Sequence, residues 1–113
     1  MDCEAYLIAL EHFDKALELS YLPINKNRLL EAYDCRGCTK KFLGRNESAI
    51  IDFTKAIEID SSDPFLFIWR GSAYEALQEY EEAIKNFKMS LIIDPNLDFI
   101  KTMIEHIKKI YGV

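Results

Sequence analysis

The sequence predicts an all-α protein of about six antiparallel helices, and three observations support this fold class. The chain has 113 residues, of which 50% are hydrophobic and 29% charged, as expected for one soluble globular domain. Its four glycines and three prolines provide few turns, which disfavours a β-sandwich or barrel. Apolar residues recur at helical spacing along the chain, and part of this pattern is repeated. We therefore expect a single domain, residues 1–113, built from stacked helices.

A first helix is expected within residues 2–20. Its apolar stripe is formed by Tyr6, Ala9, Leu10, Phe13, Ala16 and Leu17. Residues 13–19 closely parallel residues 53–59, at an offset of 40. This segment therefore looks like half of a repeat whose complete copies follow.

The middle of the chain contains two copies of one unit. Residues 30–63 can be placed over residues 64–97 with a constant offset of 34 and no gap. Chance would give roughly two identical pairs at ordinary residue frequencies. The sequence has nine, which are Arg36 and Arg70, Gly37 and Gly71, Leu43 and Leu77, Glu47 and Glu81, Ala49 and Ala83, Ile50 and Ile84, Phe53 and Phe87, Ile59 and Ile93, and Asp60 and Asp94. Each copy has room for two helices, so we expect two helix hairpins.

In the first copy, a helix is predicted over residues 28–42. Gly44 is a candidate stop signal, because glycine adopts the left-handed conformation that ends many helices. Asn46 is expected to cap the second helix, which places Ala49 and Phe53 on its buried face.

In the second copy, Asp63 and Pro64 predict a helix start, because aspartate caps free amides and proline lacks the amide that would need a partner. This helix is expected to end near Leu77, with Gly71 allowing close approach of a neighbour. After a break at residues 78–79, a second stripe is formed by Tyr80, Ala83, Ile84, Phe87 and Leu91. We expect the helix to end before Asp94 and Pro95, where the next begins. Residues 97–111 then form a last amphipathic helix that caps the stack.

The 34-residue period, with Gly71, Tyr74, Tyr80, Ala83, Phe87 and Pro95 at the corresponding positions, resembles the tetratricopeptide repeat. The resemblance covers residues 30–97 and implies a right-handed superhelix of helix hairpins. Three features depart from the family pattern. Arg36 and Arg70 replace an aliphatic residue, Lys40 stands where tyrosine is usual, and Ser61 stands where proline is usual.

The resemblance implies that the first helix of each repeat lines a concave groove that binds a peptide or helix of a partner protein. Transferred by position, the groove residues are Glu31, Asp34, Cys35, Cys38, Lys41, Phe42, Phe65, Ile68, Trp69, Ser72 and Glu75. The last helix could add Phe99, Met103 and His106.

Some members of the family grip the carboxyl-terminal acidic peptide of heat-shock chaperones with a clamp of Lys, Asn and Arg. Here Cys35 stands at the position of an Asn, and Phe65 and Trp69 stand at the positions of a Lys and an Arg. The resemblance therefore implies that the clamp is absent. An apolar stripe of Phe65, Ile68 and Trp69 replaces it and either binds a partner or packs against the next helix.

A structural role is the alternative function. If the first helix of the chain corresponds to the second helix of a repeat, the first helix of that repeat is missing. The residues that it would cover are then candidates for exposure: Leu7, Leu10, Leu29 and Leu30. The first helix could fold back as a cap, the chain could form a homo-oligomer through this face, or the segment could belong to a longer array.

Cys35, Arg36, Gly37 and Cys38 match the Cys-x-x-Cys spacing of thiol oxidoreductases and zinc sites, which is a second alternative. The pair falls in the middle of a predicted helix, away from a helix amino terminus, and Cys3, His12 and His106 are scattered along the chain. We therefore expect two small side chains on the groove helix and no metal site.

Charge and motifs limit the remaining functions. Fourteen basic and nineteen acidic residues give a net charge of −5, which disfavours nucleic acid and anionic membranes as partners. No phosphate-binding loop or catalytic motif is present, so no enzyme and no cofactor are expected. The acidic amino terminus and the odd number of cysteines favour the cytoplasm.

Overall fold

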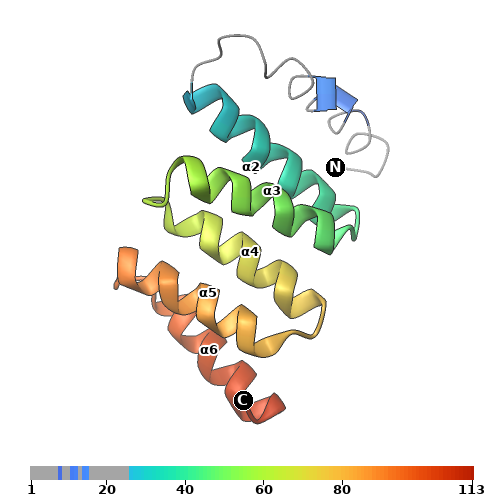
Figure 1. Ribbon diagram of the computed structural model, residues 1–113. Coiled ribbons are helices and arrows are strands. Elements are labelled where there is room, and N and C mark those ends of the chain that lie inside the picture. Colours follow the sequence, from blue (N-terminus) through green and yellow to red (C-terminus); the bar gives the residue numbers. More distant parts are fainter. Residues whose placement is uncertain (1–7, 9–10, 13, 16–25) are drawn as a thin grey trace.

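A computed structural model describes residues 8, 11–12, 14–15 and 26–113, and every secondary-structure element among them is an α-helix. The bounds are Lys26–Phe42 for α2, Asn46–Ile59 for α3, Pro64–Ala76 for α4, Tyr80–Ile93 for α5 and Asp98–Tyr111 for α6. Figure 1 shows each helix beside the one before it, with short turns between them. The predicted all-α fold is confirmed.

The first predicted helix lies mostly outside the described residues. Residues 8, 11–12 and 14–15 are helical, and Asp14 forms an ion pair with Arg36 of α2 at 3.2 Å between Oδ1 and Nη1. This contact places residue 14 against the face of α2 that a preceding helix of the stack would cover. Leu7 and Leu10 fall outside the described residues, whereas Leu30 packs against a core cluster.

Three of the predicted helix boundaries are confirmed. The Phe65 backbone N–H donates to Asp63 Oδ1 at 2.9 Å, and Pro64 is the first residue of α4. Gly44 lies between α2 and α3 in the left-handed conformation, with φ of 78°. Gln78 has a φ of 61° in the break before α5.

Two predicted boundaries are wrong. Asn46 is the first helical residue of α3, and Arg45 holds the capping position without a side-chain hydrogen bond. The last helix begins at Asp98 rather than at Pro95 or Leu97, because the chain first makes a turn in which Asp94 Oδ1 accepts the Asn96 N–H at 3.1 Å. Asp60 makes the equivalent turn in the first repeat.

The core consists of two buried clusters that meet at α4. One contains Ala49, Phe53, Ala56 and Leu66. The other contains Ile68, Ala83, Ile84, Phe87, Ile100, Ile104 and Ile107. Because Leu66 and Ile68 belong to different clusters, α4 joins the two repeats into one continuous core.

The two helical glycines face a phenylalanine of the partner helix at close range. A Cβ atom on Gly37 would lie 2.8 Å from the Phe53 ring, and one on Gly71 would lie 2.9 Å from the Phe87 ring. The glycine and phenylalanine of each pair are equivalent between the repeats. The close approach predicted for Gly71 is therefore confirmed, and Phe87 is the residue that fills the space.

Helix α6 covers the second cluster with Ile100, Ile104 and Ile107. Its solvent side carries exposed charged residues such as Lys101 and Glu105. The Tyr111 ring stacks on Tyr80 with ring centroids 3.7 Å apart, which attaches the end of α6 to the start of α5.

Candidate interaction surface

The residues predicted to line the groove lie on α2 and α4, the first helices of the two repeats. Among them, Glu31, Phe42 and Phe65 are exposed, and Ile68 is buried. The partly buried ones are Asp34, Cys35, Cys38, Lys41, Trp69, Ser72 and Glu75. We call these residues, without Ile68, the first-helix face.

Ile68 does not belong to an accessible surface. Its side chain is only 6% exposed and packs in the cluster that contains Phe87 and Ile104. Because this cluster is built from side chains of α5 and α6, the side of α4 that carries Ile68 is covered. The stripe predicted from residues 65, 68 and 69 is therefore divided between the core and the surface.

Phe65 and Trp69 keep part of their rings accessible. The Phe65 side chain is 46% exposed in the first turn of α4, where Asp63 fixes the helix start. Trp69 lies one turn later and packs one part of its ring against the cluster of Phe53 and Leu66. Trp69 therefore contributes to the core and to the surface.

Negative charge gathers beside these rings. Burial raises the pKa of Asp34 above its ordinary value, and the nearby charges of Asp63 and Glu31 add to this effect, whereas the hydrogen bond from Cys38 opposes it. Glu31 and Asp63 therefore both lie within electrostatic reach of Asp34. The surroundings of Asp34 are acidic, and Lys41, the cation of the first-helix face, lies near Cys38.

Cys35 and Cys38 lie in the middle of α2, as predicted from the repeat alignment. Burial raises the pKa of both thiols, to about 12 for Cys38, and the charge of Asp34 adds to the effect. The Cys38 Sγ donates to Asp34 Oδ1 at 3.6 Å. Thiols in this environment stay protonated near neutral pH, which opposes thiolate chemistry.

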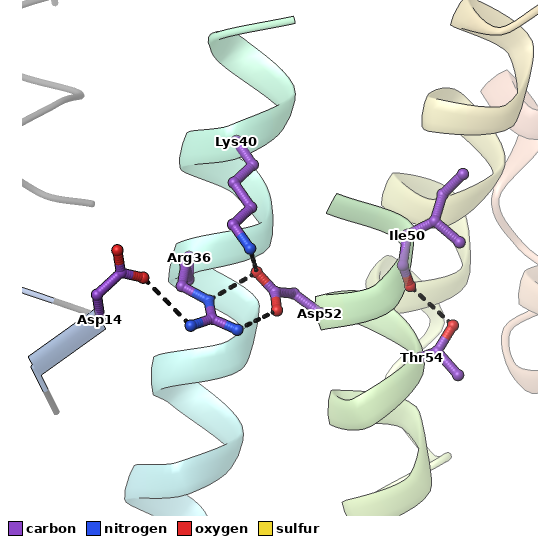
Figure 2. A network of polar contacts seen from close by, with 6 residues as sticks. All are labelled: Asp14, Arg36, Lys40, Ile50, Asp52 and Thr54. Atoms are coloured by element: carbon purple, nitrogen blue, oxygen red, sulfur yellow. Dashed lines mark hydrogen bonds and ion pairs between the residues drawn. The ribbon is translucent and has the colours of Figure 1, made fainter. Parts of the chain in front are cut away.

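A buried ionic network on α2 and α3 was missed by the sequence analysis. Asp52 is fully buried, and Arg36 donates to both of its carboxylate oxygens, at 2.9 Å from Nε and 2.6 Å from Nη2. Lys40 Nζ lies 3.0 Å from Asp52 Oδ2, and Arg36 Nη1 reaches Asp14. Figure 2 shows Arg36 between the two carboxylates, so it joins α2 to both neighbouring segments.

Arg70 repeats this arrangement with neutral partners. Its Nε donates to Asn86 Oδ1 at 2.7 Å, and its Nη1 donates to the Thr54 hydroxyl at 3.2 Å. Each arginine therefore binds the second helix of its own repeat and the segment that precedes the repeat. The signal was present in the sequence, since both arginines replace the usual aliphatic residue and each has a polar residue sixteen positions later.

Helix α6 continues the pattern of α4 at the same offset of 34. Phe99 is 52% exposed and corresponds to Phe65. Met103 corresponds to Trp69 and is partly buried against the second cluster, while His106 is exposed. The apolar character of the α4 surface therefore extends to the end of the stack.

We also considered a surface cavity, metal sites and membrane-spanning helices among the described residues. A shallow cavity of about 360 Å³ lies at the start of α5, where its lining includes Tyr80 and Val113, far along the sequence from Asp34. Within the described ranges, no group of three or more His, Cys, Asp or Glu side chains is arranged to hold a metal ion. None of the described helices is long and apolar enough to cross a membrane.

Comparison with solved structures supports the fold. The chain is similar to MamA, with 20% identity, a TM-score of 0.71, and coverage of 74% of this chain and 48% of that one. It is also similar to the TPR domain of Arabidopsis OM64, with 24% identity, a TM-score of 0.68, and coverage of 95% and 97%. The first TPR of Spaghetti (RPAP3), bound to the HSP90 peptide SRMEEVD, is similar over 100% of this chain and 98% of its own, with 20% identity and a TM-score of 0.67.

Sequence comparison agrees with the repeat assignment. The chain is 33% identical over 89 residues to the DnaJ homolog subfamily C member 7 homolog of Schizosaccharomyces pombe, covering 79% of this chain and 18% of that protein. The tetratricopeptide repeat matches residues 30–63 and again residues 64–97, with the same boundaries as the internal repeat. The chain belongs to the tetratricopeptide-repeat family, whose members generally serve as protein-interaction modules.

Proposed function

We propose that this chain is an adaptor module that binds a segment of a partner protein along the first-helix face. The observation that carries the proposal is the exposed Phe65, which lies one helical turn before Trp69 and directly after the helix start at Asp63, above a well-packed core. Exposed aromatic side chains beside polar groups are typical of residues that dominate binding energy in protein interfaces. We assign the chain no catalytic role, no cofactor and a cytoplasmic location.

The bound segment is proposed to differ from the acidic peptide of the Spaghetti domain. A chaperone-type clamp needs cations, whereas this chain has Cys35, Phe65 and Trp69 at the corresponding positions. The neighbouring Asp34 and Glu31 would repel a peptide carboxylate. These features support a module that lacks the chaperone clamp.

Substitution of Phe65 tests the proposal. We expect Phe65→Ser to reduce capture of partner proteins from a native lysate, because it removes an accessible aromatic contact while leaving the core intact. Ile92→Ser is the matched control, since Ile92 is 72% exposed on α5, outside the first-helix face. Helical circular dichroism should be the same for both variants.

The proposal fails if Phe65→Ser and Ile92→Ser retain the same proteins in the same amounts. Trp69→Ala is a less clean variant, because Trp69 also packs against the core and its loss would lower stability.

A further inference from the structure

We infer that the partner segment is basic and amphipathic, with Lys or Arg side chains against Glu31, Asp34 and Asp63 and apolar side chains against Phe65 and Trp69. This inference rests on the proposed function and specifies the chemistry of its ligand.

The first step concerns unbalanced charge. Within the described part of the chain, none of the ion pairs involves Glu31, Asp34 or Asp63. Glu31 lies one helical turn before Asp34 on α2, and the charges of Glu31 and Asp63 both raise the pKa of Asp34. The cation of this face, Lys41, lies near Cys38. Cations from another molecule would relieve this repulsion, which favours a basic segment.

The second step concerns the position of the apolar groups. Asp63 accepts the Phe65 backbone N–H, so a carboxylate is held at the start of α4, where the exposed Phe65 also lies. Asp34 accepts a hydrogen bond from the Cys38 thiol, and Cys38 packs against the same core cluster as Trp69. Acidic and apolar groups therefore lie together on α2 and at the start of α4, which matches a segment that presents both basic and apolar side chains.

The third step excludes other ligands. An acidic segment would add like charges to the three carboxylates, at a cost that grows as water is excluded. An entirely apolar segment would cover the partly buried Asp34 carboxylate, which accepts a hydrogen bond from the Cys38 thiol, without supplying a cation, which is also costly. A basic amphipathic segment satisfies both kinds of group.

Trp69 provides the measurement, because it is the only tryptophan of the chain and lies on the proposed surface. The probe is a tryptophan-free peptide of leucine and lysine in a helical pattern, about 18 residues long so that it can form a helix. Two peptides serve as comparisons, one with glutamate in place of lysine and one with serine in place of leucine. We expect only the leucine and lysine peptide to change Trp69 fluorescence with saturation, and its binding to weaken as salt is added.

Charge-removing variants test the location. Asp34→Asn and Glu31→Gln should each weaken binding of the leucine and lysine peptide about threefold, and the double variant about tenfold, as expected for partly exposed ion pairs. Glu58→Gln is the matched control, because it removes the same charge from an exposed position on α3. Its affinity should equal that of the wild type.

Three results would overturn the inference. These are tighter binding of the leucine and glutamate peptide, equal weakening by Glu58→Gln and Asp34→Asn, and no binding of the lysine peptide by a protein that still captures partners through Phe65. The last result would leave the proposed function standing, whereas loss of Phe65-dependent capture would remove the function itself.

Discussion

Asp52 and Arg36 show how one buried polar contact holds neighbouring helices of the stack together. The Asp52 side chain is fully buried and is balanced by Arg36 and Lys40, both on α2. The hydrogen bond to Asp52 raises the pKa of Arg36 further, so the arginine stays charged. The same positions of the second repeat hold the neutral Asn86 and Tyr74 opposite Arg70.

We expect Asp52→Asn to lower the free energy of unfolding by about 3 kcal/mol, because two partly buried cations lose their anion. The double variant Lys40→Tyr and Asp52→Asn should recover at least part of this loss, since it reproduces the side chains of the second repeat. Urea unfolding followed by circular dichroism measures both. A double variant no more stable than Asp52→Asn would contradict this explanation.

Asp34 should destabilise the fold when it is ionised. Its pKa in the folded state is raised above the ordinary value of 3.8, first by burial and then by Asp63 and Glu31. The folded state therefore binds the proton more tightly than the unfolded chain, and stability falls as pH rises from the ordinary pKa through the raised one.

We expect Asp34→Asn to unfold at a higher temperature than the wild type at pH 7. The difference should shrink as pH falls below the ordinary pKa of 3.8, where the wild-type side chain is also neutral. Thermal melts across this pH range test the sign, with Glu58→Gln as the control. A variant that is more stable but binds the basic peptide less well would separate a binding role for Asp34 from a structural one.

At the scale of the helical elements, the hairpins depend on a glycine opposite a phenylalanine. Gly71 lets α5 approach until the Phe87 ring occupies the space of a side chain, and Gly37 does the same opposite Phe53. In an isolated helix alanine would be the better residue, so the tertiary contact outweighs helix propensity here.

Gly71→Ala should destabilise the protein by about 1–3 kcal/mol through overpacking. Adding Phe87→Leu should make the alanine less costly, because the shorter side chain frees the space that the Cβ atom needs. Gly44→Ala is the contrasting case, since its Cβ would meet no atom within 4 Å and only its φ of 78° causes strain. Chemical denaturation of the three variants distinguishes packing from backbone strain, and a neutral Gly71→Ala would disprove the packing account.

The sequence predicted the helices better than their ends. The buried faces of α3 and α5 were predicted correctly, because Ala49 and Phe53 recur as Ala83 and Phe87, whereas the α4 stripe of residues 65, 68 and 69 is divided between core and surface. Asn46 was misassigned because good capping chemistry does not ensure that the chain turns at that residue. The start of α6 was placed too early because the turn at Asp94 depends on a side-chain contact that periodicity does not report.

At the scale of the whole molecule, α4 is the element that both core clusters share. In a linear stack each helix depends mainly on its neighbours, so opening should begin at the ends. We expect amide hydrogen exchange to be slowest in α4. Ile100→Ala should speed exchange in α5 and α6 well before it affects α3, and uniform acceleration over all helices would contradict this expectation.

The proposed interaction surface was only partly predictable from the sequence, because it depends on contacts between helices. Repeat positions place Phe65 and Trp69 at the surface of α4, but the burial of Ile68 depends on the cluster that α5 and α6 form against α4. The clustering of Asp34 with Asp63 joins two different helices of the stack. Contacts of this kind become visible only once the hairpins are assembled.

The partners of the two arginines differ between the two junctions of the stack. Asp14 binds Arg36 of the first repeat, and Thr54 binds Arg70 of the second repeat. Lys88 of α5 holds the position equivalent to Asp14 and Thr54. If the two repeats exchanged places, the arginine of the first would face Lys88, and two cations would meet where an acceptor is needed. The side chains at the junctions therefore favour the order in which the two repeats stand, and they give the stack a preferred direction.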